Sequence, residues 1–193
     1  IGADFAVNIK ENIEIHGEIS YFQDNPKNMI VNNQLLSAEE DGYAYLLGVR
    51  WLNRWEITTI FEYYHTDAGF TQDEFDAYLA FFRQSLASGK EDLIKRAAGV
   101  MQNNFSGSTL MQDYLYLQVQ KPEPFDWLYF TPSGGTIYNL RDQSVLLAFN
   151  FSYQPVTNFE FDLKPTFMFG KDDSEYGSQR FQQKAEAWLR FYF

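Results

Sequence analysis

The sequence predicts an all-β protein, an antiparallel transmembrane β-barrel of which about nine strands are visible. Apolar and polar residues alternate with a period of two through most of the 193-residue chain, which indicates strands with one apolar and one polar face. The chain is rich in aromatic residues (19 Phe, 13 Tyr and 4 Trp), yet its mean hydropathy is low at −0.39. Short connections alternate with long ones, as in transmembrane β-barrels.

The alternation predicts strands over 3–10, 13–23, 42–53, 55–66, 110–121, 126–138, 144–154, 159–170 and 184–193. The strand at 126–138 has the weakest pattern, because Pro132, Gly134 and Gly135 interrupt it, and a bulge or bend is expected there. Short turns are predicted near 11–12, 53–54, 122–125, 141–142 and 156–158. Longer links are predicted at 24–41, 67–109 and 171–183. In a barrel the short turns would lie on the periplasmic side and most long links outside the cell.

The longest link, 68–109, carries signals for a helical hairpin. Thr71 and Glu74 form a capping-box pattern, and apolar residues then recur at helical spacing up to Gly89, which is a plausible helix end. A second helix is predicted over 91–102. The sequence therefore predicts an extracellular loop that covers the barrel mouth through Phe75, Tyr78 and Phe82. The alternative is a loop that only packs on its neighbours.

Composition excludes several classes of function. The chain has no Cys, so it cannot form a disulfide scaffold, a thiolate zinc site or a Cys nucleophile. Its net charge of −11, without a basic tract, argues against nucleic-acid binding. No apolar run approaches the roughly 20 residues of a membrane-spanning helix. The first residues lack the basic and apolar regions of a signal peptide.

The final segment carries a resemblance to a known class. The run from Ala185 to Phe193 resembles the terminal strand of bacterial outer-membrane β-barrel proteins, of porin-like or export type, which end in Phe after alternating apolar residues. The resemblance implies integral insertion in the outer membrane of a Gram-negative bacterium, among lipid and lipopolysaccharide. It also implies that Phe193, Phe191 and Leu189 form a signal for the barrel-assembly machinery.

Strand number extends this interpretation. Bacterial single-chain barrels have an even number of strands, so nine strands imply that 1–193 is the C-terminal portion of a larger barrel. A miscounted strand, giving eight or ten, is the alternative. On this interpretation the polar faces line a lumen. The candidate lumen-lining residues are Glu14, His16, Glu18, Arg50, Glu56, Glu62, Glu160, Asp162, Lys164, Glu186 and Arg190.

These features predict a channel for passive passage of small solutes. The alternatives are a structural barrel that holds a lipoprotein, a plug, an electron-transfer subunit or another copy of itself, and a soluble β-sandwich binding module. If the barrel is narrow, cross-strand salt bridges would instead fill it.

No enzymatic activity, cofactor or metal is expected. Glu14, His16 and Glu18 face one side, but same-face residues on a strand are roughly 7 Å apart, so a solvated or salt-bridged row is favoured over a metal or proton site. His65 lies near an outer rim without a Ser-centred motif. The acids at Asp24, Glu39–Asp41, Asp172, Asp173 and Glu175 are predicted to lie in exposed loops, where they confer solubility or hold divalent cations beside lipopolysaccharide.

Overall fold

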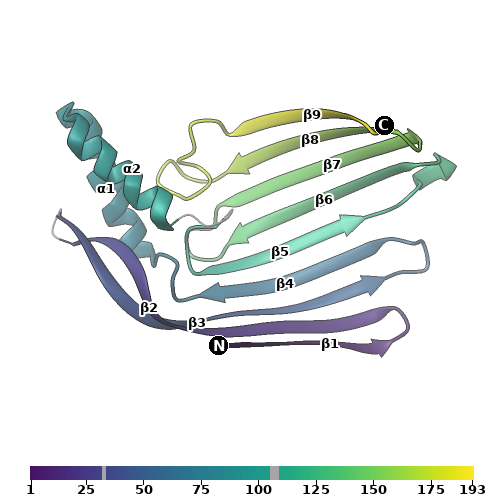
Figure 1. The fold of residues 1–193 in the computed structure, drawn as a ribbon, viewed down its shortest axis with the longest axis horizontal. Helices are drawn as coiled ribbons and strands as arrows, with labels where there is room; N and C mark the ends of the chain where they lie inside the picture. Colours follow the sequence, from purple (N-terminus) through teal and green to yellow (C-terminus); the bar gives the residue numbers. More distant parts are fainter. Residues whose placement is uncertain (32–33, 105–108) are drawn as a thin grey trace.

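Nine strands form one antiparallel sheet in the order β1 to β9, so each strand pairs with its neighbours in sequence (Figure 1). The computed structural model describes residues 1–31, 34–104 and 109–193. The strands are β1 (Gly2–Lys10), β2 (Ile13–Val31), β3 (Gln34–Leu52), β4 (Thr58–Thr66), β5 (Asp113–Gln120), β6 (Phe130–Asn139), β7 (Val145–Val156), β8 (Phe159–Phe169) and β9 (Gln183–Phe191). The all-β antiparallel class is confirmed. The sheet is open, because β1 and β9 each pair on one side only.

The predicted link at 24–41 is wrong, because β2 and β3 continue through it as a long hairpin. The register shifts between Phe22 and Asn25, where Asp24 adopts a left-handed φ of 51°. This bulge changes which residues share a face, so the simple period of two disappears from the sequence while pairing continues. The side chain of Asp41 stabilises the bulge by accepting a hydrogen bond from the Asp24 amide at 3.0 Å.

Other strand boundaries also differ from prediction, those of β4 and β6 among them. The segment 55–57 is a turn, in which Asn53 Oδ1 accepts hydrogen bonds from the amides of Trp55 and Ile57. The predicted start of the strand at 126 falls in a short 3₁₀ helix, η1 (Pro124–Asp126), and residues 127–129 link this helix to β6. The expected bulge in β6 is absent from its pairing with β5 and β7. Gly134 instead leaves room for the ring of Phe149, which would lie about 3 Å from a Cβ at that position.

The register gives the sheet two different faces. The apolar face carries exposed aliphatic and aromatic side chains on every strand except β6, among them Phe5, Val7, Ile15, Ile19, Leu47, Phe61, Leu117, Val119, Phe149, Leu163 and Leu189. The opposite, polar face carries most of the charged strand residues. The chain forms one sheet, whereas a sandwich packs two sheets face to face.

The connections divide between two rims of the sheet. The short-turn rim holds the links at 11–12, 53–57, 121–129 and 157–158. The long-loop rim holds the end of β2 at Val31 and the start of β3 at Gln34, the helical insertion, the 140–144 link and the 170–182 connection. The predicted alternation of short and long connections holds only in part, because the 121–129 link spans nine residues where a short turn was predicted at 122–125, and β2 and β3 replace the predicted link at 24–41.

Helices α1 (Gln72–Ser88) and α2 (Glu91–Asn104) form the predicted hairpin within 68–109. The Thr71 hydroxyl accepts from the Glu74 amide, the Glu74 carboxylate accepts from the Thr71 amide, and Gly89 ends α1 with a left-handed φ of 66°. Both helices contact β2, and the Lys27 ammonium, only 4% exposed, pairs with Glu74 at 3.0 Å. In the described part of the chain, neither helix has the length and apolar character needed to cross a membrane.

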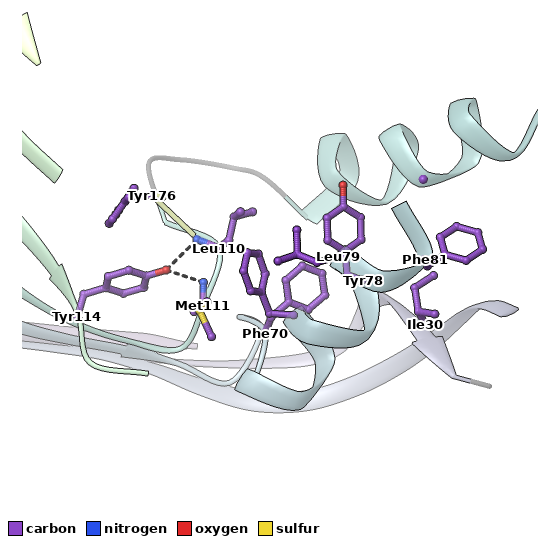
Figure 2. Close-up of a cluster of buried hydrophobic side chains, with 11 residues drawn as sticks. Ile30, Phe70, Tyr78, Leu79, Phe81, Leu110, Met111, Tyr114 and Tyr176 are labelled. Atoms are coloured by element: carbon purple, nitrogen blue, oxygen red, sulfur yellow. Dashed lines mark hydrogen bonds between the residues drawn. The ribbon is translucent and has the colours of Figure 1, made fainter. Parts of the chain in front are cut away.

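The buried core lies at the long-loop rim and not between two layers (Figure 2). It joins α1 to the ends of the strands through Phe70, Phe75, Tyr78, Met111 and Tyr114. The partly buried residues packed against it include Ile137, Leu146 and Met168, which share the polar face of the sheet. We call α1, α2 and the 170–182 connection, together with the strand ends beneath them, the capped end.

Candidate functional site

The candidate lumen-lining residues share the polar face, with one exception. In the β2–β5 and β8–β9 pairs, even-numbered residues lie opposite even-numbered residues, so Glu14, His16, Glu18, Arg50 and Glu62 lie on the same side. The same register, carried through β6 and β7, places Glu160, Asp162, Lys164, Glu186 and Arg190 on this side as well. Glu56 is the correction, because it sits in the 53–57 turn with a φ of 60° and lies outside the strands.

One polar cluster joins β2 to β4 across β3. His16 Nε2 lies 3.0 Å from Glu62 Oε1, and His16 Nδ1 lies 3.7 Å from Glu14 Oε1. Gly48 occupies the β3 position between them, and a Cβ there would lie 2.3 Å from His16 Nε2. Glycine at this position therefore lets two side chains on alternate strands meet directly. Within the row predicted at Glu14, His16 and Glu18, the histidine therefore pairs with Glu14 on its own strand and with Glu62 on β4.

A second polar cluster joins β8 to β9. The Arg190 guanidinium donates to Asp162 at 2.8 Å and pairs with Glu160 at 3.0 Å. Lys164 Nζ lies 3.5 Å from the same Asp162 carboxylate, which is only 3% exposed. The Glu186 carboxylate pairs with Lys184 one position along the same face. Opposite charges therefore alternate along the polar face of β8 and β9.

Metal binding receives no geometric support from these clusters. Among the described residues, no group of three or more His, Asp or Glu side chains is arranged to hold a metal ion. Glu18 and Arg50 are exposed on the polar face, and Arg50 lies directly across from Glu14 in the β2–β3 register. The polar face therefore presents side chains of both charge signs.

Glu175 corrects the prediction that the acids of the 171–183 link are exposed. Its carboxylate is 1% exposed and accepts hydrogen bonds from the Tyr114 hydroxyl, the Asn139 side-chain amide and the Leu110 backbone amide, each at 2.7 Å. The Tyr114 hydroxyl in turn accepts from the Leu110 and Met111 amides (Figure 2). One carboxylate thus ties the 170–182 connection to β5, β6 and the segment that follows the helical insertion.

Burial raises the pKa of the Glu175 carboxyl to about 7, although its three hydrogen-bond donors act in the opposite direction. Nearby, the Asp142 carboxylate accepts from the Glu175 backbone amide at 2.5 Å. Asp172 and Asp173, the other acids of this connection, are exposed as predicted. Sequence reasoning missed Glu175 because its partners come from distant strands.

The three residues predicted to cover a mouth lie on α1. Phe75 and Tyr78 are buried in the core at the capped end, and Phe82 is half-buried. Because that core packs on polar-face residues, the helical hairpin and the 170–182 connection lie over the same side of the sheet as the polar clusters. The acids Glu40 and Asp41 also have structural roles, because they bind Lys27 and the Asp24 bulge.

His65 belongs to a compact polar group at the long-loop rim, on the apolar face. Its Nδ1 lies 2.7 Å from Asp113 and its Nε2 lies 3.1 Å from Asp67. The Tyr63 hydroxyl and the Arg141 guanidinium also bind Asp113. These partners satisfy the imidazole and hold the ends of β4 and β5 together.

The residues predicted as an assembly signal extend along the last strand. Leu189 and Phe191 lie on the apolar face opposite Phe161 and Phe159, and Phe193 follows the end of β9, fully exposed.

Comparisons of the chain with family models, curated proteins and solved structures found no match.

Proposed function

We propose that this sheet is part of the wall of a bacterial outer-membrane β-barrel that passes small solutes. The observation that carries the proposal is the apolar face. Away from the long-loop rim, no Asp, Glu, Lys or Arg lies on this face, which is made by the odd-numbered residues of 3–9, 13–21, 43–51, 59–63, 115–119, 145–153, 159–169 and 183–191 and the even-numbered residues of 130–138. The acids of this face, Glu39, Asp41 and Asp113, lie near that rim. A lone charge at mid-membrane on a lipid-facing surface costs about 2–4 kcal/mol, so its absence favours contact with lipid.

Strand directions indicate how the barrel is completed. Neighbouring strands alternate in direction, so β1 and β9 run the same way. If β1 and β9 paired directly, the pairing would be parallel. This holds for closure within one chain, and also for β9 of one copy against β1 of a second copy in a shared barrel. An all-antiparallel closure needs an odd number of further strands between β9 and β1, which gives an even total. In the proposal those strands complete the hydrogen-bond ladder that a membrane requires.

The polar face would then line the lumen, and the capped end would narrow its outer mouth. The wall carries both signs of charge, as in the ion pairs of Arg190 and Lys164 with Asp162, so strong ion selectivity is not expected. The retained alternative is a barrel that holds a partner protein. The two open edges favour it, because an unpaired edge strand is a template for strands of another chain.

Cysteine labelling tests the proposal, since the chain contains no Cys. Ala148→Cys lies on the polar face of β7, and its neighbour Leu147→Cys lies on the apolar face. In full-length protein embedded in planar bilayers, we expect a charged, water-soluble methanethiosulfonate to modify Ala148→Cys and to lower its conductance. Leu147→Cys should stay unmodified until the bilayer is dissolved.

Equal labelling of the two positions in the bilayer would refute the membrane-wall proposal. Selective labelling of Ala148→Cys without any measurable conductance would refute the channel and favour the partner-holding barrel.

Removal of Phe193 tests the assembly signal separately: outer-membrane levels of the protein should fall, whereas normal levels would count against that role.

A further inference from the structure

A cavity of about 670 Å³ lies between α1, α2 and the 170–182 connection. This volume is within the range of about 300–1,000 Å³ that small-molecule sites occupy. The lining comes mainly from α1 and the 170–182 connection, with Ala98 from α2. Because all three elements belong to the capped end, the cavity lies outside the strand body and opens on the long-loop side.

The walls on the α1 side are apolar apart from Arg83. Tyr78, Leu79, Phe82 and Leu86 contribute to them, and Leu86 is 50% exposed although it is a large aliphatic residue. The Tyr78 ring stacks on Phe82 and on Phe70, with ring centroids 6.1 Å apart in both pairs. These stacked rings connect the cavity to the buried core, so the apolar wall is held firmly. Such a wall suits a hydrocarbon chain.

Two arginine side chains, Arg83 and Arg180, also line this cavity. Arg83 donates to the backbone carbonyl of Asp172 at 2.9 Å, and the Arg180 guanidinium lies 5.3 Å from the Phe181 ring. Within the described ranges, neither makes an ion pair with a carboxylate, whereas Arg141 and Arg190 both do. Among the described lining residues, the negative charge of Asp172 stands against the positive charges of Arg83 and Arg180. The lining is therefore net positive, in a chain whose net charge is −11.

We propose that this cavity binds a free medium-chain alkyl carboxylate. The hydrocarbon tail would lie against Phe82 and Leu86, and the carboxylate would be bound by Arg83 and Arg180. Guanidinium groups match the two oxygens of a carboxylate, and such charge-assisted hydrogen bonds are about twice as strong as neutral ones. The site goes beyond conduction, and its test does not require the barrel to carry current.

The test uses the full-length protein in phosphatidylcholine nanodiscs, with empty nanodiscs as background. Dansyl-undecanoate reports binding by its fluorescence, and decanoate and decanol compete for the site. For the double variant Arg83→Gln/Arg180→Gln, we expect the competition constant of decanoate to rise at least about tenfold, because charge-assisted contacts are lost. The constant for decanol, which lacks the anionic group, should stay unchanged.

The matched control is Arg96→Gln, which removes an exposed arginine of α2 that does not line the cavity. It should bind decanoate like the unmodified protein. Ala98→Trp, which places a large side chain in the cavity, should abolish competition by both decanoate and decanol.

Three results would overturn the proposal: no saturable reporter fluorescence with the unmodified protein, a loss of decanoate binding in the Arg96→Gln control equal to that in the double variant, or undiminished decanoate binding by the double variant. Purified lipid A provides a further arm. If it displaces the reporter at lower concentration than decanoate, the site belongs to lipopolysaccharide and the assignment to a free carboxylate is wrong.

Discussion

At the capped end, the Phe75 side chain is fully buried, whereas Phe61 in the body of β4 is 44% exposed. The same contrast holds for charge: Glu175 is enclosed by hydrogen-bond donors, whereas Glu18 and Arg50 face open space. The capped end therefore holds its shape by its own packing. The strand body has hydrogen-bonded ladders but, among the described residues, no buried core, so its apolar side chains are left largely exposed.

Phe75→Ala gives the largest expected difference between these regions. Removing a fully buried phenylalanine costs about 3–5 kcal/mol, because the transfer free energy is lost and a cavity remains. Amide hydrogen exchange of α1, in full-length protein in detergent, should therefore accelerate by more than a hundredfold.

Phe61→Ala is the matched control, since it makes the same substitution on the apolar face of β4. Its effect on the exchange of α1 should be close to zero. Comparable acceleration in the two variants would show that the capped end is not an independently packed unit.

The stability of the folded 170–182 connection should depend on pH, which gives a second test of the comparison. The pKa of the Glu175 carboxyl is raised from 4.5 to about 7, so the folded connection binds a proton more tightly than the unfolded one. Its stability is greatest below about pH 4.5 and decreases as the pH rises to about 7. The raised pKa corresponds to a loss of about 3 kcal/mol across that window.

Glu175→Gln tests this sign, because glutamine reproduces the neutral acid at every pH. After correction for the intrinsic pH dependence of exchange, amides of 170–182 should lose protection between pH 5 and pH 8 in the unmodified protein and keep it in the variant. An unchanged pH profile in the variant would show that a group other than Glu175 causes the effect.

The sequence predicted the strand body far better than the capped end, for a physical reason. Strand alternation is a local property, so Phe159–Phe169 could be read from its own residues. The β2–β3 extension is stabilised by Lys27 and Glu74, which are distant in sequence, and the Asp24 bulge hides its period. Glu175 has its partners 61 and 65 residues away, at Tyr114 and Leu110. The capping box at Thr71 was predictable because its two partners lie within one turn.

The smallest expected effects come from two glycine substitutions in the capped end, Gly69→Ala and Gly99→Ala. Together they separate the contribution of packing from that of helix propensity. A Cβ on Gly69 would lie 2.2 Å from the Met111 carbonyl oxygen, so Gly69→Ala must move the backbone between β4 and α1 away from the start of β5. We expect a loss of about 1–3 kcal/mol, as for other overpacked sites. The measurement is the urea concentration at which the helical circular-dichroism signal falls by half.

Gly99→Ala is the matched control in α2, where a Cβ would meet no atom within 4 Å. It should stabilise the helix by roughly 0.5–1 kcal/mol, because alanine loses less backbone entropy than glycine in a helix. Opposite shifts of the urea midpoint would show that the insertion is docked on the strand ends by close backbone contact. If Gly69→Ala shifted the midpoint in the same direction as Gly99→Ala, the β4–α1 segment would not be packed against Met111, and the capped end would lose one of its attachments to the sheet.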